Sequence, residues 1–272
     1  MQFPATELVL DANGAVYHLG LQPEQLASKI ILVGDQDRVA KISRFFDVIE
    51  YQIQHREFVS HTGLYNGKRL TVLSTGIGTD NIDICLQELD ALVNIDLVKR
   101  EEKQTKQSLE IVRIGTCGIL QKAIPVHSFI LSTHALGLDN VAHFYPIPFD
   151  ENELQLLQDI KTQITFPTNV LPYLSAANSD LVKRMQSEQV HCGITITSSG
   201  FYGPQGRSLR LESNMRDIHL QLGAFQNKEL RIMNFEMESS AIFALGKALG
   251  HRCTTLCLGV ANRPNEEFST GI

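Results

Sequence analysis

The segment GFYGPQGR (200–207) carries side chains that a plain surface turn does not require. Its glycines and proline suit a turn, whereas Phe201 adds an aromatic face, Gln205 a carboxamide and Arg207 a guanidinium. A carboxamide both donates and accepts hydrogen bonds, while a guanidinium only donates them. Because the segment follows the β-rich run HCGITITSS (191–199), we predict a loop at the end of a strand that holds a flat, polar molecule.

Two other segments suggest that an anion is bound as well. In GDQDR, Gly34 stands at a turn and Arg38 follows four residues later, so a backbone N–H and a guanidinium can converge on one anion. The alternative is a capped helix start with a solvated arginine. Arg56, in HREF, is either a further anion ligand or an ordinary surface charge.

Arg113 gives a sharper indication because it lies in the apolar run VRIGTCG (112–118). An unpaired charge in such a run would be costly to bury. Arg113 therefore needs an anionic partner, which is either a carboxylate of the core or a bound ligand. The hydroxyl of Thr116 follows shortly after it, as oxyanion recognition would require.

An acidic cluster, NFEMES (234–239), also allows two explanations. Acidic residues are favoured at the N-terminus of a helix. A carboxylate such as that of Glu238 also accepts hydrogen bonds from vicinal hydroxyls well, and sugar hydroxyls fit that description.

Strand-like and helical runs alternate along the chain and must position these residues. The apolar strand-like runs are 29–34, 69–75, 109–116, 128–133, 191–199 and 252–260. A helix over NIDICLQELDALVNI would align Ile82, Leu86, Leu89 and Val93, with Asp80 available as its cap. A second helix over 236–249 would stop at Gly250. We predict an α/β fold, a single domain over 1–272, with a central, mixed, mostly parallel sheet flanked by helices.

Bulk composition limits the class of protein. The chain has 272 residues, 43% hydrophobic and 20% charged, and a formal net charge of −6, which argues against a general nucleic-acid binder. We see no signal peptide and no run long enough to span a membrane, so we expect a cytoplasmic protein. The five scattered cysteines are expected to be reduced, and we expect no metal site.

Eight short motifs occur in the order and approximate spacing of nucleoside phosphorylases, and the chain resembles that family over about residues 15 to 265. Within the family the motifs are most similar to those of uridine phosphorylases. The motifs are YHLGL (17–21), GDQDRV (34–39), HREF (55–58), STGIG (74–78), RIGTCG (113–118), FYGPQGR (201–207), NFEMES (234–239) and VANR (260–263).

The resemblance implies a role for each matching residue. Gly34, Arg38, Arg113 and Thr116 would bind phosphate, with Arg56 supplied by a neighbouring subunit. Met237 and Glu238 would hold the ribose, helped by His18 of the neighbour. Phe201, Gln205 and Arg207 would hold the base. Arg113, Glu238 and Arg207 would take part in catalysis.

The resemblance also implies a pentosyltransferase of nucleoside salvage or catabolism. Uridine and phosphate would give uracil and ribose 1-phosphate, without a metal or organic cofactor. The partners would be the nucleoside and inorganic phosphate, with no nucleic acid and no membrane. A homo-oligomer is expected, at least a dimer with shared sites and up to a hexamer, in which family members can hold a monovalent cation at the interface.

This sequence departs from the family at three points. GIGTDNIDI replaces the Pro- and Ser-containing stretch usual after STGIG, where the cation is held. The base loop has the form QGR rather than QER. Family members usually end in a long helix, so we expect either a segment beyond Ile272 or a different cap for the sheet.

Three other functions remain open on the sequence. A purine nucleoside phosphorylase would typically place an aspartate in the base loop, whereas no acid occurs here between Glu188 and Glu212. A nucleosidase of the same fold would not need the arginines Arg38, Arg56 and Arg113. A non-catalytic nucleoside-binding protein would keep the pocket without turnover.

Overall fold

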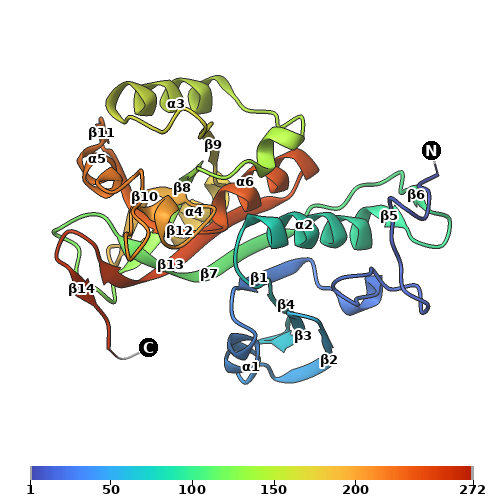
Figure 1. Cartoon of the computed structure of the whole chain (residues 1–272). Helices are drawn as coiled ribbons and strands as arrows, with labels where there is room; N and C mark the ends of the chain where they lie inside the picture. Colours follow the sequence, from blue (N-terminus) through green and yellow to red (C-terminus); the bar gives the residue numbers. More distant parts are fainter. Residues whose placement is uncertain (1, 271–272) are drawn as a thin grey trace. The chain divides into compact units, whose positions relative to one another are not determined.

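The computed structural model describes residues 2–270, coloured along the chain in Figure 1, and divides into two compact units. Unit 1 comprises residues 2–112 and 249–251, and unit 2 comprises residues 113–248 and 252–270. Both units combine strands with helices, so the predicted α/β class is confirmed. The prediction of one domain over 1–272 stays a prediction.

Unit 1 is built on strands in the order β1–β4–β3–β2. β1 and β4 run parallel, and the β4–β3 and β3–β2 pairs are antiparallel hairpins. Its strands are β1 (Lys29–Val33), β2 (Val48–His55), β3 (Phe58–Tyr65), β4 (Lys68–Ser74), β5 (Ile95–Asp96) and β6 (Glu101–Glu102). Its helices are η1 (Pro23–Gln25), α1 (Asp37–Ser43) and α2 (Thr79–Asn94).

Helix α2 confirms the predicted apolar stripe, since Ile82, Leu86, Leu89 and Val93 are all buried. The prediction that Asp80 caps this helix is wrong. The helix begins at Thr79, which makes Asp80 its second residue, and the N-cap position is taken by a glycine with no side-chain hydrogen bond. A carboxylate one position inside the helix still lies at the positive end of the helix dipole, so its charge remains favourable there.

Unit 2 contains a larger mixed sheet in the order β11–β12–β10–β8–β13–β7, with β9 on β8 and β14 on β13. Its strands are β7 (Glu110–Ile119, which enters the unit at Arg113), β8 (Phe129–Gly137), β9 (Tyr173–Ala176), β10 (Val190–Thr197), β11 (Gln226–Asn227), β12 (Leu230–Glu236), β13 (Arg252–Asn262) and β14 (Glu267–Phe268). Its helices are η2 (Val141–Phe144), α3 (Glu151–Gln163), α4 (Ser179–Met185), η3 (Gly203–Gln205), α5 (Ile218–Ala224) and α6 (Ser239–Leu249).

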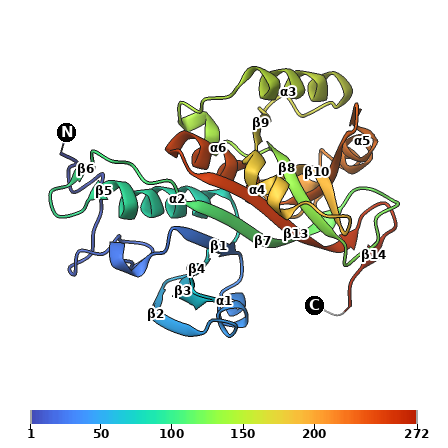
Figure 2. The ribbon, with the colours of Figure 1, turned by 180° about the vertical axis from the view of Figure 1, so that it is seen from behind.

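The parallel core of unit 2 consists of β8, β10 and β12, while β13 pairs antiparallel with β8. Both views place β7 and β13 beside each other (Figures 1 and 2). The core of this unit is mainly aliphatic and includes Leu136, Leu156, Ile160, Leu174, Ile194, Ile196, Leu222 and Phe235. Because β8, β10 and β12 run the same way, their carboxyl ends lie at one edge, where ligands bind in open α/β sheets.

The remaining predictions on composition can be compared with the described residues. All five cysteines are free thiols, and four of them are buried. Within residues 2–270, no helix combines the length and hydrophobicity needed to cross a bilayer. The cytoplasmic location stays a prediction.

Candidate functional site

In unit 1, the turns after the parallel strands β1 and β4 meet. A Cβ added to Gly34 would lie 3.4 Å from the carbonyl oxygen of Gly76 and 3.7 Å from Nη2 of Arg38. The guanidinium of Arg38 therefore lies back over the turn that begins α1, where its Nε is 4.0 Å from the carboxylate of Asp35. The guanidinium therefore lies near the turn backbone, while the binding of an anion by the two groups stays a prediction.

A second cluster in unit 1 contains Arg56 and His18, the two residues that the resemblance assigns to a neighbouring subunit. Arg56, in the turn between β2 and β3, donates from Nη2 to the hydroxyl of Tyr17 at 3.2 Å, and its guanidinium carbon lies 5.2 Å from the Tyr17 ring centre. The same ring packs edge-on against His18, with centroids 5.0 Å apart. His18 and Arg56 therefore occupy one cluster, as contribution to a common site requires.

Glu88 of α2 fixes His18, and sequence reasoning missed it. One carboxylate oxygen lies 2.6 Å from Nδ1 of His18, and the carboxylate accepts the backbone N–H groups of His18 and Leu19. His55 donates from Nδ1 to the carbonyl of His18 at 2.9 Å. A carboxylate on one imidazole nitrogen sets the ring's orientation and leaves the other nitrogen for a ligand. In the sequence, Glu88 is an ordinary acidic residue of the predicted helix, 70 residues from His18, so no local pattern indicates its contact with His18.

In unit 2, Arg113 is buried with 5% of its surface exposed. Its Nη2 donates to Glu238 in a short hydrogen bond, and its Nη1 lies 3.6 Å from Oε2 of Glu236. Nη1 also lies 3.5 Å from Sγ of Cys257, while Nε has no hydrogen-bond partner among the described residues. Although burial opposes the charge, the two carboxylates raise the pKa of Arg113. Carboxylates of the core thus supply the anionic partner that the sequence required.

Glycine at position 115 is required by this arrangement. A Cβ added there would overlap the guanidinium of Arg113, which folds back over the strand. Any larger side chain would push the guanidinium away from Glu238. Thr116 is half-buried on the same strand, and Met237 is half-buried between the two glutamates.

Glu236 holds the start of α6 and was not singled out in the sequence. Its carboxylate accepts the backbone N–H groups of Glu238 and Ser239 at 3.0 Å each, besides facing Arg113. These N–H groups have no partner within the helix, so an acid at this point satisfies them. The helix-start explanation is confirmed for Glu236, while Glu238 contacts Arg113 and its role toward sugar hydroxyls stays a prediction.

The three residues predicted to hold a base lie together in unit 2. Arg207 donates from Nη1 to the carbonyl of Phe201 at 2.6 Å and, in a short hydrogen bond, to the side-chain oxygen of Gln205. Its guanidinium carbon lies 3.9 Å from the centre of the Phe201 ring, a cation–π distance. Gln205 is buried, whereas 49% of Phe201 is exposed. The loop therefore presents an aromatic surface beside an ordered guanidinium and carboxamide.

Arg263 is the member of this cluster that sequence reasoning missed. It donates from Nη1 to the carbonyl of Gln205 at 3.0 Å, and a Cβ added to Gly118 would lie 3.9 Å from both Arg263 and Nη2 of Arg207. Burial, followed by the charge of Arg263, lowers the pKa of Arg207 to about 10. Tyr202 acts in the opposite direction and raises this pKa, and no carboxylate of the described residues contributes. The signal for Arg263 was the motif VANR, which had no role assigned.

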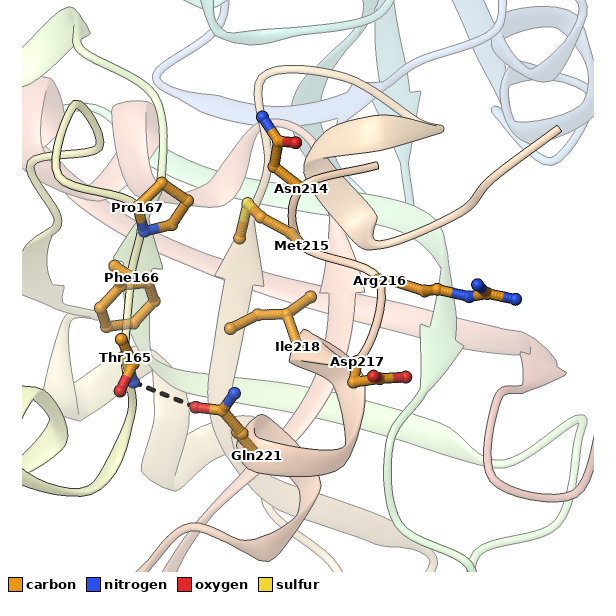
Figure 3. A pocket seen from close by; sticks show the side chains of 9 residues that line it. All are labelled: Thr165, Phe166, Pro167, Asn214, Met215, Arg216, Asp217, Ile218 and Gln221. Carbon is orange, nitrogen blue, oxygen red and sulfur yellow. Dashed lines mark hydrogen bonds between the residues drawn. The ribbon is translucent and has the colours of Figure 1, made fainter. Parts of the chain in front are cut away.

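A pocket of about 410 Å³ is lined in part by residues 214–218, the segment against which Gly206 of the loop packs (Figure 3). Phe166 and Pro167 line one wall, Met215 and Ile218 face them, and Gln221 accepts the backbone N–H of Thr165 at 3.0 Å. In Figure 3 the guanidinium of Arg216 points away from this space, so the pocket offers no cation to a phosphate. The residues predicted to hold a base lie on the loop over 200–207 and do not line this pocket.

Gly206 fixes the loop against the wall of that pocket. Its φ is +71°, and an added Cβ would lie 2.5 Å from the carbonyl oxygen of Met215 and 3.0 Å from Cγ2 of Ile218. Gly67 has the same φ of +71° but open space around it.

We predict that Gly206→Ala lowers the free energy of unfolding by about 2–4 kcal/mol, whereas Gly67→Ala lowers it by about 1–2 kcal/mol, the usual cost of the left-handed conformation. Urea denaturation of both variants measures the difference. Equal losses would show that the packing of Gly206 contributes nothing.

Comparisons with known proteins place these clusters in context. The family model of the phosphorylase superfamily matches residues 28–270. A uridine phosphorylase of Thermococcus kodakarensis is 29% identical over 270 residues, which cover 98% of this chain and 84% of its own. The uridine phosphorylase of Haemophilus influenzae is 29% identical over 260 residues, with 93% and 88% covered.

A solved structure gives the same indication. The nucleoside phosphorylase of Trypanosoma brucei, described as showing uridine phosphorylase activity, superimposes with a TM-score of 0.87 at 29% sequence identity. The match covers 97% of this chain and 94% of the other.

Proposed function

Since this chain belongs to the phosphorylase superfamily, we propose that it is a pentosyltransferase that cleaves uridine with inorganic phosphate, giving uracil and ribose 1-phosphate. The observation that carries the choice of base is the cluster of Phe201, Gln205 and Arg207, in which a guanidinium and a carboxamide are ordered beside an aromatic face. Relatives named uridine phosphorylase match the chain over nearly its whole length.

The hydrogen-bonding groups and the positive charge of the loop over 200–207 suit a pyrimidine base. Uracil offers carbonyl oxygens and an N–H, which match the donors of Arg207 and the two-sided carboxamide of Gln205. Arg263 adds a second positive charge beside them. A purine leaving group would instead be helped by an acid that protonates it, and no acid occurs between Glu188 and Glu212. Cationic groups stabilise the negative charge that develops on departing uracil.

Ribose would be held by Glu238 and Met237, with His18 of a neighbouring subunit. Glu238 would accept hydrogen bonds from the vicinal hydroxyls and favour the positive charge that develops on the ring. Glu238 now contacts Arg113. Binding of substrates would therefore exchange this ion pair for a new ion pair between phosphate and Arg113 and for hydrogen bonds from the ribose hydroxyls to Glu238.

Phosphate would be held by Gly34, Arg38, Arg113 and Thr116, together with Arg56 from the neighbour. Arg113 supports this role because Nε remains without a partner among the described residues although the group is buried. Held near the anomeric carbon, the phosphate would attack as the glycosidic bond stretches, so that positioning and electrostatics supply the rate enhancement.

We propose that the reaction uses no organic cofactor and no metal. Family members can hold a monovalent cation at the subunit interface, and the proposal neither requires nor excludes one. The proposal also includes a cytoplasmic homo-oligomer, at least a dimer. The cluster of Arg56, Tyr17 and His18 supports shared sites, because the two residues expected from the neighbour lie together in one unit.

The first test is release of free base from uridine, thymidine, inosine and adenosine, each with and without phosphate. We expect cleavage of uridine that requires phosphate. Preferred cleavage of inosine or adenosine would make the protein a purine nucleoside phosphorylase, and cleavage without phosphate would make it a nucleosidase. Absence of cleavage of every nucleoside would indicate a binding protein.

Subunit sharing predicts complementation between inactive variants. If Arg56 serves the neighbour's site, a mixed dimer of Arg56→Ala and Glu238→Ala chains contains one intact site. Refolding equal amounts together should then restore about a quarter of wild-type activity, since half of the dimers are mixed and each has one intact site of two.

The control for this experiment pairs Arg38→Ala with Glu238→Ala. Both residues are proposed to serve the site of their own chain, so no mixture of these chains has an intact site and no activity should return. Recovery in neither mixture, or equal recovery in both, would contradict the sharing of Arg56.

A further inference from the structure

The carboxyl ends of β8, β10 and β12 coincide at Thr197. In the parallel register, Thr197 is paired with Gly137 of β8 on one side and with Glu236 of β12 on the other. Thr197 is fully buried and Glu236 is 4% exposed. The threonine therefore stands directly beside the carboxylate that faces Arg113.

The hydroxyl of Thr197 makes two hydrogen bonds whose directions are unambiguous. It accepts the backbone N–H of Ser240 at 2.9 Å, and this N–H can only donate. Its own single proton therefore goes to Oε1 of Glu236, at 2.6 Å. Thr197 thus joins β12 to the first turn of α6, because Ser240 is the second residue of that helix.

Glu236 connects Thr197 to the groups that are proposed to bind the substrates. The same carboxylate accepts the N–H groups of Glu238 and Ser239 and lies 3.6 Å from Nη1 of Arg113. A rotation of the Glu236 side chain would loosen both the guanidinium and the backbone that presents Glu238. A buried network of this kind holds one arrangement only when every member is satisfied.

A second set of hydrogen bonds holds the side chain of Ser240. Its Oγ donates to Oδ2 of Asp139 at 2.6 Å, and the hydroxyl of Tyr173 donates to Oδ1 of the same carboxylate at 2.8 Å. Gly137 leaves space for the Tyr173 ring, because a Cβ at Gly137 would overlap that ring. The chain of contacts therefore runs without a gap from Tyr173 to Arg113.

We propose that Thr197 is a positioning residue for the reaction: its hydroxyl fixes Glu236, and Glu236 fixes Arg113 and the backbone of Glu238. This inference rests on the proposed function, in which Glu238 binds the ribose hydroxyls. Loss of the Thr197 hydroxyl should therefore weaken recognition of the 2′-hydroxyl in addition to slowing turnover.

The test compares Thr197→Val, Thr197→Ser and Thr254→Val. Thr254 is a matched control, since it is equally buried in unit 2 and its hydroxyl donates only to a backbone carbonyl, that of Ser132. Thr197→Val should lower kcat/KM for uridine about 10- to 100-fold, as expected for a lost hydrogen bond to a charged group. Thr197→Ser and Thr254→Val should stay within about threefold of wild type.

The decisive readout is the ratio of kcat/KM for uridine to that for 2′-deoxyuridine. The ratio should fall in Thr197→Val and be retained in the other two variants. If Thr197→Val keeps the wild-type ratio, or Thr254→Val changes it equally, Thr197 is only structural and the inference fails.

If Thr197→Val does not fold, Thr197→Ala serves in its place, since it removes the same hydroxyl without adding a methyl group beside Glu236. A ratio that falls in this variant supports the inference, and an unchanged ratio overturns it. Wild-type protein without phosphate-dependent cleavage of uridine would instead overturn the proposed function itself.

Discussion

Burial of the charged Arg113 is the constraint on which the arrangement of unit 2 depends. A guanidinium cannot remain charged in an interior without anions and hydrogen-bond acceptors around it. Glu236 and Glu238 supply those anions, and Gly115 supplies the space into which the guanidinium folds. The Glu236 carboxylate also orders the start of α6, so the structure that stabilises the charge also positions the groups that would receive phosphate and ribose.

At the loop over 200–207, two arginines lie close to each other, and no carboxylate among the described residues is bonded to Arg207. Arg207 is bound to two oxygens of its own loop and stacks on Phe201, while Arg263 donates to the backbone carbonyl of Gln205. Burial and, after it, the charge of Arg263 lower the pKa of Arg207, so the two neighbouring cations are unfavourable for each other. A ligand that brings negative charge to this point relieves that repulsion, which is what departing uracil would do.

Sequence reasoning predicted the groups that carry their own local signal and missed those defined by distant contacts. Arg113 was expected to need an anion because its neighbours are apolar, and the loop over 200–207 was expected to form one cluster. Glu238 was predicted, but its pairing with Arg113 across 125 residues was not, and Arg263, which lies 58 residues from Gln205, was missed. Such pairs follow from strand order, which a single sequence does not specify. The Asp80 cap failed because helix boundaries depend on one or two residues of backbone geometry.

The account is tested most directly by the steady-state kinetics of Arg113→Ala with phosphate as the varied substrate. Removal of the guanidinium should raise the KM for phosphate at least about tenfold and lower kcat, since an interaction with a charged group is lost in both the ground state and the transition state. The melting temperature should be measured alongside, because the variant also leaves Glu236 and Glu238 without their cation. Phosphate kinetics that remain at wild-type values in a folded Arg113→Ala protein would contradict the assignment of this arginine, and with it the proposed use of the site.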